Sequence, residues 1–396
     1  MAKAANSHDI IIIGAGPAGL SFARTLADTG LDMVLVERLP MEVLENPPED
    51  GRDIALTHTS ETLMKNLGLW AHLPEDQLGT IRDAKVLNGT DPYALHFAAE
   101  ESGAPYLGKL VPNHLIRKAA FESVRPSSNI SILTEKTVTA VETDAKEGRV
   151  TLDDGTVLTA PLVIAADSRM SQNRRRMGIA AQMTDFGRVV IVAEFTHTLP
   201  HNDIATECFH YDRTLAILPM AGMKSSAVIT LPADEADDVL AMNPEAFAAD
   251  VAERFDHQLG EMTLATERHA YPLMGVIADR FVANRFALVG DAAVGMHPVT
   301  AHGYNLGLSG AALLAREIRD AKMRGDDIGA MPGLLAYERQ HRRKVLPLYH
   351  GTNAIVRLFT TTTGPAKALR AAALRLGNVL TPIKKRIEQQ LTEIEV

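Results

Sequence analysis

A glycine-rich run and one acid near the start of the chain have the residue types and spacing that bind a dinucleotide. The run GAGPAG at residues 14–19 follows an apolar stretch, Ile10–Ile13, and precedes residues that suit a helix. A second apolar stretch, Met33–Val36, ends in Glu37, close to the spacing of about 20 residues expected of a dinucleotide-binding βαβ unit. The context therefore indicates a dinucleotide fingerprint and leaves open which dinucleotide is bound.

Each residue of this fingerprint has a physical role. Gly14 permits a tight turn, Gly16 lets the backbone approach a pyrophosphate, and Gly19 lets the following helix pack close to the sheet. The helix N-terminus offers unpaired N–H groups and the positive end of its dipole to that pyrophosphate. Glu37 can accept hydrogen bonds from a ribose diol.

The bulk composition excludes several classes of protein. The chain has 396 residues, 46% of them hydrophobic, and a net charge of −9, which argues against nucleic-acid binding. Its single cysteine, Cys208, rules out both a disulfide framework and a disulfide reductase, and it fits a reducing compartment. The N-terminus shows no signal peptide, and no apolar run approaches the roughly 18 residues of a membrane span. We therefore expect a cytoplasmic protein.

The elements that must position the fingerprint form an α/β pattern with an insertion. Short apolar or alternating runs predict strands at 10–13, 33–36, 130–133, 138–143, 149–152, 157–158, 162–165 and 286–289. Between them, runs at 188–195, 207–211, 215–219 and 226–231 predict an inserted antiparallel sheet. Helices are predicted at 60–67 with Ser60 as the cap, at 113–124, 243–255 and 305–319, and over most of the chain after Pro332.

Two further motifs carry a family resemblance. Residues 166–174, ADSRMSQNR, resemble the ADGxxSxxR segment of aromatic-hydroxylase flavoproteins, and GDAAVGMHPVTAHGYNLGL at 290–308 resembles their GDAAH…P…GQGxNxG segment. With the first fingerprint, their order and spacing resemble the class A flavin-dependent aromatic monooxygenases. Arg52 and residues 55–70 and 215–219 are similar to the ubiquinone-biosynthesis (UbiH-like) branch, and the last motif looks most like its UbiM subgroup. The resemblance extends from Asp9 to about Leu346.

The resemblance implies a Rossmann-like domain that binds FAD, and it suggests where the cofactor sits. Asp291 would bond a ribityl hydroxyl, Pro298 would fix a turn beside the isoalloxazine ring, and a helix starting at Gly303 would face the flavin N1–C2=O edge. Arg52, also readable as a solvated loop residue, and Arg117 fall where FAD-contacting side chains sit. The expected cofactor-binding set is Gly14, Gly16, Ala18, Gly19, Glu37, Arg38, Arg52, Arg117, Val138, Asp167, Gly290, Asp291, Pro298, Gly303, Tyr304 and Asn305.

No catalytic base and no metal site are assigned from the sequence. The flavin-facing candidates are His297, Pro298, His302 and Tyr304. The chain also departs from the family pattern: Ser168 replaces the usual Gly, Val294 the His of GDAAH, Ala301-His302 the Gly-Gln of GQG, and Gly310 a common acid. Residues 174–176, all arginine, are interpreted as a solvated basic face rather than as a phosphate site for NADPH.

The resemblance also implies the reaction. NADH or NADPH would reduce FAD, O2 would add at the flavin C4a atom, and the hydroperoxide would hydroxylate the aromatic ring of a polyprenylated ubiquinone precursor. Alternatives are a hydroxylase of another phenolic metabolite, a flavin reductase acting on isoprenoids, and a non-catalytic member of a biosynthetic complex. The chain's only tryptophan, Trp70, excludes the WxWxIP segment of a halogenase.

The domain boundaries follow from the same motifs. We expect an FAD-binding domain from 1–80, 113–180 and 273–345, a substrate domain from 81–112 and 181–272, and C-terminal helices at 346–396. The last segment has leucines and isoleucines at roughly helical spacing and several basic residues. Packing on the body or on a partner of a ubiquinone-biosynthesis complex, and peripheral membrane contact, both remain open for it.

Overall fold

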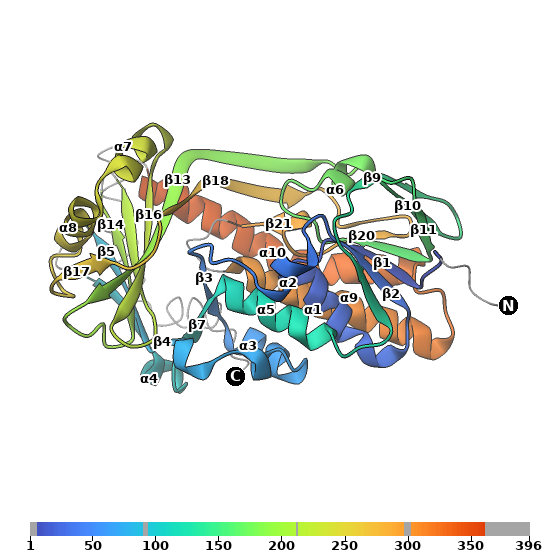
Figure 1. The fold of residues 1–396 in the computed structure, drawn as a ribbon, viewed down its shortest axis with the longest axis horizontal. Helices are drawn as coiled ribbons and strands as arrows, with labels where there is room; N and C mark the ends of the chain where they lie inside the picture. Colours follow the sequence, from blue (N-terminus) through green and yellow to red (C-terminus); the bar gives the residue numbers. More distant parts are fainter. Residues whose placement is uncertain (1–5, 90–93, 211–212, 297–301, 361–396) are drawn as a thin grey trace.

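The computed structural model describes residues 6–89, 94–210, 213–296 and 302–360 of the chain. Its elements form two bodies at opposite ends of the view, joined by two long strands (Figure 1). The first body contains a six-stranded sheet and the second a nine-stranded sheet.

The six-stranded sheet holds the glycine-rich run at the end of its strand β1. Its order is β19 (Val282–Ala283), β20 (Phe286–Leu288), β12 (Leu162–Ala165), β1 (Ile10–Ile13), β2 (Met33–Val36) and β8 (Ile130–Leu133), parallel except for β19. Strands β1, β2 and β12 are buried along their whole length, which explains their uninterrupted apolar sequences. The strand at 286 therefore joins the sheet of the strand at 10, as the predicted insertion requires.

Helices and a small sheet cover this sheet on opposite faces. Helix α1 (Pro17–Thr25) packs between α5 (Asn113–Val124) and α9 (His302–Arg324). The other face carries the sheet β11 (Val157–Ala160), β10 (Gly148–Leu152) and β9 (Val138–Thr143). At Gly148 a Cβ would lie 2.5 Å from the Val163 side chain, so the two sheets meet closely there.

The nine-stranded sheet is the predicted insertion. It runs β21 (Val294–Gly295), β18 (His269–Ala278), β13 (Ala181–His197), β16 (Lys224–Pro232), β15 (Thr214–Pro219), β14 (Ile204–Phe209), β5 (Asp83–Asn88) and β6 (Ala94–Ala98), with β17 (Met262–Leu264) beside β13. One face packs on α7 (Ala236–Ala241) and α8 (Pro244–Arg254) through Phe195, Ile229 and Phe247. The other face looks toward the first body.

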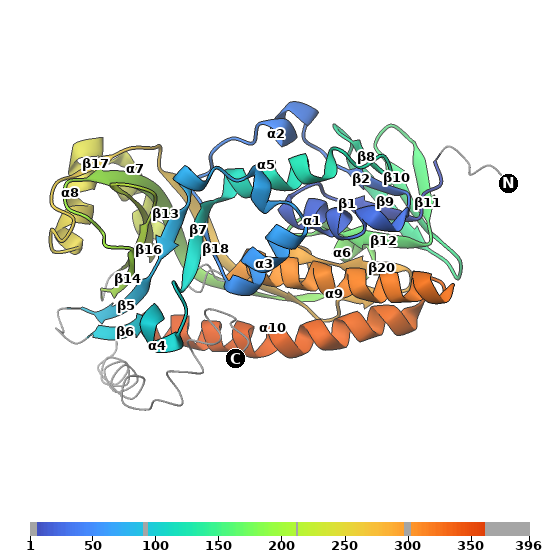
Figure 2. The same ribbon diagram turned by 90° about the horizontal axis from the view of Figure 1, so that it is seen from below.

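A second three-stranded sheet and a long helix join the two bodies. The sheet consists of β3 (Asp53–Leu56), β7 (Gly108–Pro112) and β4 (Gly79–Ile81). Helix α10 (Met331–Thr360) lies beside α9, and its Leu358 reaches the apolar cluster of the nine-stranded sheet (Figure 2). The remaining helices are α2 (Met41–Glu45), α3 (His58–Asn66), α4 (Ala99–Ser102) and α6 (Gln172–Arg176), with single 3₁₀ turns at 27–29, 70–72, 75–77, 233–235 and 290–292.

Most predicted elements are confirmed, and two details are wrong. Thr57, not Ser60, caps α3, and its hydroxyl accepts the Ser60 N–H. Strand β13 is 17 residues long because a bulge between Asp185 and Val189 lets it pair with β18 on both sides. The described part of the chain after Pro332 is helical up to Thr360, as predicted.

Membrane-spanning helices and metal-binding groups can be assessed for the described residues only. None of their helices combines the length and the apolar character needed to cross a membrane. Their His, Cys, Asp and Glu side chains form no group that could hold a metal ion. The predicted C-terminal helices beyond Thr360 lie outside these residues.

Candidate functional site

The glycine-rich turn after β1 is tightly packed on one side and open on the other. Gly14 has φ +105°, and a Cβ there would lie 2.6 Å from the Ala166 carbonyl oxygen. A Cβ on Gly19 would collide with the Gly14 carbonyl, so helix and turn can approach only with glycine at both positions. A Cβ on Gly16 would meet no atom within 4 Å, and this residue begins α1 without a side-chain cap or an acid in the first turn.

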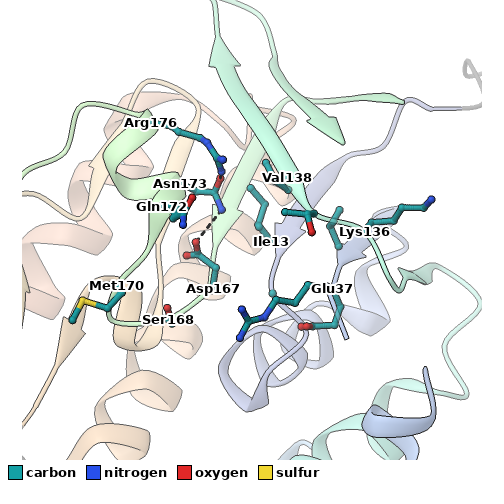
Figure 3. A pocket seen from close by; sticks show the side chains of 14 residues that line it. Ile13, Glu37, Lys136, Val138, Asp167, Ser168, Met170, Gln172, Asn173 and Arg176 are labelled. Carbon is teal, nitrogen blue, oxygen red and sulfur yellow. Dashed lines mark hydrogen bonds between the residues drawn. The ribbon is translucent and has the colours of Figure 1, made fainter. Parts of the chain in front are cut away.

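A pocket of about 310 Å³ lies beside this turn (Figure 3). Five of the predicted cofactor-binding residues line it: Gly14, Glu37, Arg38, Val138 and Asp167. Four of them follow the strands β1, β2 and β12, whose carboxyl ends meet at one edge of the parallel sheet, and Val138 comes from β9 of the small sheet beside it.

Two acids in this pocket differ in what holds them. Glu37 accepts hydrogen bonds from the Ala15 N–H (2.8 Å) and the Leu39 N–H (3.0 Å), so its carboxylate fixes the turn as well as facing the pocket. Asp167 accepts one from the Asn173 amide (2.9 Å), while its buried Oδ1 has no partner among the described residues. That orphaned oxygen is a free acceptor at the pocket wall.

The second group of predicted residues surrounds the start of α9. Gly290 (φ +61°) leaves room for Ala18, whose Cβ would lie 2.8 Å from a Cβ at position 290. The Asp291 carboxylate accepts a hydrogen bond from Arg169 (3.3 Å), and a Cβ on Gly303 would meet open space.

Two side chains of this group connect α9 to its neighbours. Asn305 is buried, accepts from the Thr57 N–H (3.1 Å) and donates to the Ala55 carbonyl (2.8 Å), so it ties α9 to β3. The Tyr304 and Ser21 hydroxyls are 3.3 Å apart, and burial raises the pKa of Tyr304 to about 12. Tyr304 is therefore a neutral hydrogen-bonding group rather than a base at physiological pH.

Of the predicted arginines, Arg38 lines the pocket, and Arg52 and Arg117 do not. Arg52 is exposed, pairs with Asp50 (2.6 Å) and lies over the Tyr271 ring (5.4 Å). Arg117 is half-buried on α5. Of the flavin-facing candidates, His297 and Pro298 lie outside the described residues, as does the side chain of His302.

The prediction that the arginine run at 174–176 forms a solvated face is wrong for one of its three residues. Arg174 is 1% exposed and donates to the Arg169 and Ala292 carbonyl oxygens, so it fastens the two later motifs together. Arg175 and Arg176 are exposed, and Arg176 lines the pocket. The buried arginine was mistaken for a solvated one because neighbours on a short helix face opposite directions.

Several pocket residues were not predicted. Lys136, Met170, Gln172, Asn173 and Arg176 also line the pocket. Met170, Gln172 and Asn173 lie in or beside α6 and within the second motif, so that motif was the signal that could have identified them. Lys136 follows β8 in a turn that carries no motif.

These features fit the adenosine–pyrophosphate part of a dinucleotide. The open space at Gly16 and the uncapped start of α1 suit a pyrophosphate. Glu37 and the free Asp167 oxygen are acceptors for hydroxyl groups. No cysteine lies in the pocket, which leaves the redox chemistry to the cofactor.

Comparison with known proteins agrees with this geometry. The FAD binding domain family matches residues 7–345. The chain is 51% identical over 388 residues to a Neisseria meningitidis protein named ubiquinone hydroxylase UbiM, covering 97% of this chain and 84% of that one. It is 35% identical to ubiquinone hydroxylase UbiL of Rhodospirillum rubrum, covering 95% and 87%.

Solved structures show the same fold. The p-nitrophenol 4-monooxygenase PnpA of Pseudomonas putida superposes with a TM-score of 0.79 at 16% identity, over 99% of this chain and 100% of that one. PqsL of Pseudomonas aeruginosa, a probable FAD-dependent monooxygenase, superposes with a TM-score of 0.76 at 21% identity, over 95% of this chain and 100% of that one. The chain belongs to the FAD-binding family of flavin-dependent monooxygenases.

Proposed function

We propose that the protein hydroxylates the aromatic ring of a polyprenylated ubiquinone precursor with FAD, O2 and a nicotinamide donor. The observation that carries this proposal is the 51% identity to a ubiquinone hydroxylase over nearly the whole chain. The donor, NADH or NADPH, is left to experiment, since no described residue marks a 2′-phosphate site.

The first body would hold the adenosine end of FAD. Gly14 and Gly16 would admit the pyrophosphate, Glu37 and Arg38 would lie at the ribose and adenine, and Asp167 would accept from the cofactor with its free oxygen. Asp291, now held by Arg169, would turn to a ribityl hydroxyl. When bound, FAD supplies the redox chemistry that activates O2.

The second body would supply the substrate side. We assign residues 81–112 and 181–272 to a substrate domain, because they contain most strands of the nine-stranded sheet. The face of this sheet opposite α7 and α8 carries Val190, Val192 and Val228, which suit an apolar aromatic ring and can exclude water around it.

Purification gives the first test. The protein should emerge yellow with close to one FAD per chain, and it should convert 2-prenylphenol to a product 16 mass units heavier with NADH or NADPH and air. Flavin without turnover of 2-prenylphenol but with turnover of a simple phenol would transfer the activity to another phenolic metabolite. No flavin, and none reconstituted, would contradict the proposal.

Gly16→Ala tests the pyrophosphate position. Its Cβ fits the protein itself but would crowd the cofactor, and overpacking of about 1–3 kcal/mol corresponds to a roughly 10- to 100-fold weaker FAD affinity. Fluorescence titration of apoprotein with FAD measures the change. Gly351→Ala, another glycine with open space around it, should bind FAD like the wild type.

The C-terminal segment is proposed to approach the membrane or a partner of the biosynthetic complex. Its residues 361–396 lie outside the described part of the chain, so the proposal rests on the sequence pattern alone. Liposome flotation of the full chain and of a truncation after Leu358 compares the two directly. Equal flotation of both proteins would contradict membrane contact.

A further inference from the structure

A carboxyl group lies at the seam between the two bodies. Asp53 begins β3, next to Arg52, and its side chain faces Ser226 of β16 and Glu194 of β13. Glu194 and Ser226 are direct partners in the sheet register. Their neighbours Ala193, Phe195 and Ala227 pack on the helix-covered face, so alternation directs Glu194 and Ser226 toward the first body.

Two polar atoms of this group lack a hydrogen bond. The Asp53 Oδ2 and the Ser226 Oγ atoms are both buried and meet no hydrogen-bond geometry with any described residue, although the Ser226 hydroxyl lies close enough to lower the pKa of Asp53. The Ser226 side chain is 0% exposed. Buried polar atoms normally have partners, so both atoms are available to hydrogen-bond a polar group of a ligand that reaches them.

The segment that carries Asp53 is held on both sides. The Arg52 carbonyl accepts from the Asn113 N–H (2.8 Å), and the Asp50 carbonyl accepts from the Tyr271 hydroxyl (2.7 Å). Gly51 has φ +66° and is so close to His269 and Val192 that a Cβ would clash with both. Asp53 is therefore positioned before any ligand arrives.

The same segment borders the predicted flavin side. Two residues beyond Asp53, the Ala55 carbonyl accepts from Asn305 at the start of α9 (2.8 Å). Arg52 lies within electrostatic reach of Asp291. Strand β3, which begins with Asp53, lies between the two bodies (Figure 1), so it links the residues expected at the flavin with the sheet face expected at the substrate.

The charges around Asp53 favour proton exchange near neutral pH. Burial, with the negative Glu194, Asp50 and Glu49, raises the pKa of Asp53 to about 7, against the lowering effect of Ser226. Burial and Glu49 likewise raise the pKa of Glu194, while Lys224 opposes them. The nearby Arg52 guanidinium is engaged by Asp50.

We infer that Asp53 is the general base that removes the hydroxyl proton of the phenolic substrate, with Ser226 donating a hydrogen bond to the same oxygen. The inference rests on the proposed function. The phenolic O–H bond breaks, its proton passes to the Asp53 carboxylate, and the electron pair enters the ring, which becomes a better nucleophile. Asp53 returns the proton to the product oxygen. Overall, ring C–H, O2, NAD(P)H and one proton give ring C–OH, NAD(P)+ and water.

The pH profile of kcat/KM for 2-prenylphenol tests the assignment. In the wild type it should rise with pH through an apparent pKa near 7, because the base must be ionised. Asp53→Asn should lower kcat by roughly 100-fold or more and abolish this rising limb of the pH profile. Its flavin content and its affinity for 2-prenylphenol, measured by the change in flavin absorbance, should differ from the wild type by only a few-fold.

Two further variants should shift the apparent pKa of the kcat/KM profile in opposite directions. Glu194→Gln removes a negative neighbour, so the apparent pKa should fall. Ser226→Ala removes the hydroxyl that stabilises the ionised carboxyl, so it should rise. A structural defect alone would not produce these opposite shifts, and they keep the inference testable should Asp53→Asn fail to fold.

Glu207→Gln is the matched control. Glu207 lies on the same sheet face, and burial raises its pKa to about 8, but it faces Val86 and Ala216 rather than Asp53. Its substitution should leave the rise of kcat/KM with pH unchanged. The inference is overturned if Glu207→Gln removes the limb, or if Asp53→Asn retains it in a flavin-loaded protein that still hydroxylates 2-prenylphenol. An absence of flavin or of turnover in the wild type would instead refute the proposed function.

Discussion

Ser168 adopts a backbone conformation that L-amino acids rarely take. Its φ is +145°, in the segment between β12 and α6 where the family resemblance expects Gly, and it lines the cofactor pocket. A Cβ in this region of the φ/ψ map costs on the order of 1–3 kcal/mol. The neighbouring contacts of Asp167 and Arg174 hold the strained residue in place.

Ser168→Gly should relieve this strain. We expect the free energy of unfolding to rise by about 1 kcal/mol, after the greater entropy loss of glycine on folding is subtracted. Urea denaturation measures it. Ser168→Ala keeps the Cβ and should bring no gain, so equal stabilisation by both variants would contradict the explanation.

Single-residue roles were predictable only where a motif fixed them. Glu37 was named because it follows a buried strand of the fingerprint, and Asp167 because its segment resembles a family motif; both line the pocket. Arg174 was misplaced because nothing in its sequence shows that a guanidinium is buried against the Ala292 carbonyl, far along the chain. The acid–hydroxyl pair of Asp53 and Ser226 could not be predicted either, because the two residues lie on strands of different sheets that meet only in the folded molecule.

At the scale of elements, α9 and α10 pack through a glycine and a histidine. A Cβ on Gly310 of α9 would lie 2.7 Å from Nε2 of His341 on α10. That ring is 0% exposed and is held between Tyr337 and Phe281. The space that an acid at 310 would fill is therefore taken by an imidazole.

Gly310→Ala should destabilise the protein although alanine favours helices. The clash with a ring that cannot move costs about 1–3 kcal/mol, more than the roughly 1 kcal/mol of helix propensity gained. Gly351→Ala, in open space on α10, should stabilise by up to that propensity. Thermal unfolding of the two variants should shift in opposite directions. A stable Gly310→Ala would show that α9 and α10 can separate.

The elements themselves were predictable to different degrees. Buried parallel strands such as β1, β2 and β12 read as pure apolar runs, and their bounds are those expected. The length of β13 was underestimated, because the bulge at 185–189 and the pairing with β18 depend on residues almost a hundred positions away. The cap of α3 was assigned three residues late, since two hydroxyl residues compete for that position.

At the scale of the whole molecule, the two bodies are joined by few segments. Strands β13 and β18 cross from one to the other, and α10 reaches from α9 to the cluster around Phe209 (Figures 1 and 2). Polar links such as Tyr271 to Asp50 add to these connections. Because the proposed reaction site lies at the seam, its geometry depends on these segments rather than on either body alone.

Acid should unfold the molecule partly through His341, which lies where α9, α10 and the β18–β19 turn meet. Burial, reinforced by the nearby Lys344, lowers the pKa of His341 to about 4 from an ordinary value of 6.5. The unfolded chain therefore binds a proton that the folded protein does not between these two pH values. Stability should be unaffected by this group above pH 6.5 and should decrease by about 3 kcal/mol as the pH falls to 4.

Asp53 and Glu207 have raised pKa values and contribute with the opposite sign in the same range, so the histidine must be isolated by substitution. His341→Phe keeps an aromatic ring and loses no hydrogen bond, since neither ring nitrogen has a partner among the described residues. The difference in unfolding free energy between the wild type and this variant, measured by urea denaturation from pH 7.5 to 4, should shift by about 3 kcal/mol in favour of the variant. His72→Gln, an exposed histidine, should run parallel to the wild type. If the unfolding free energy of His341→Phe also ran parallel to that of the wild type, the His341 imidazole would be protonated in the folded protein at no cost in stability, and the explanation would be wrong.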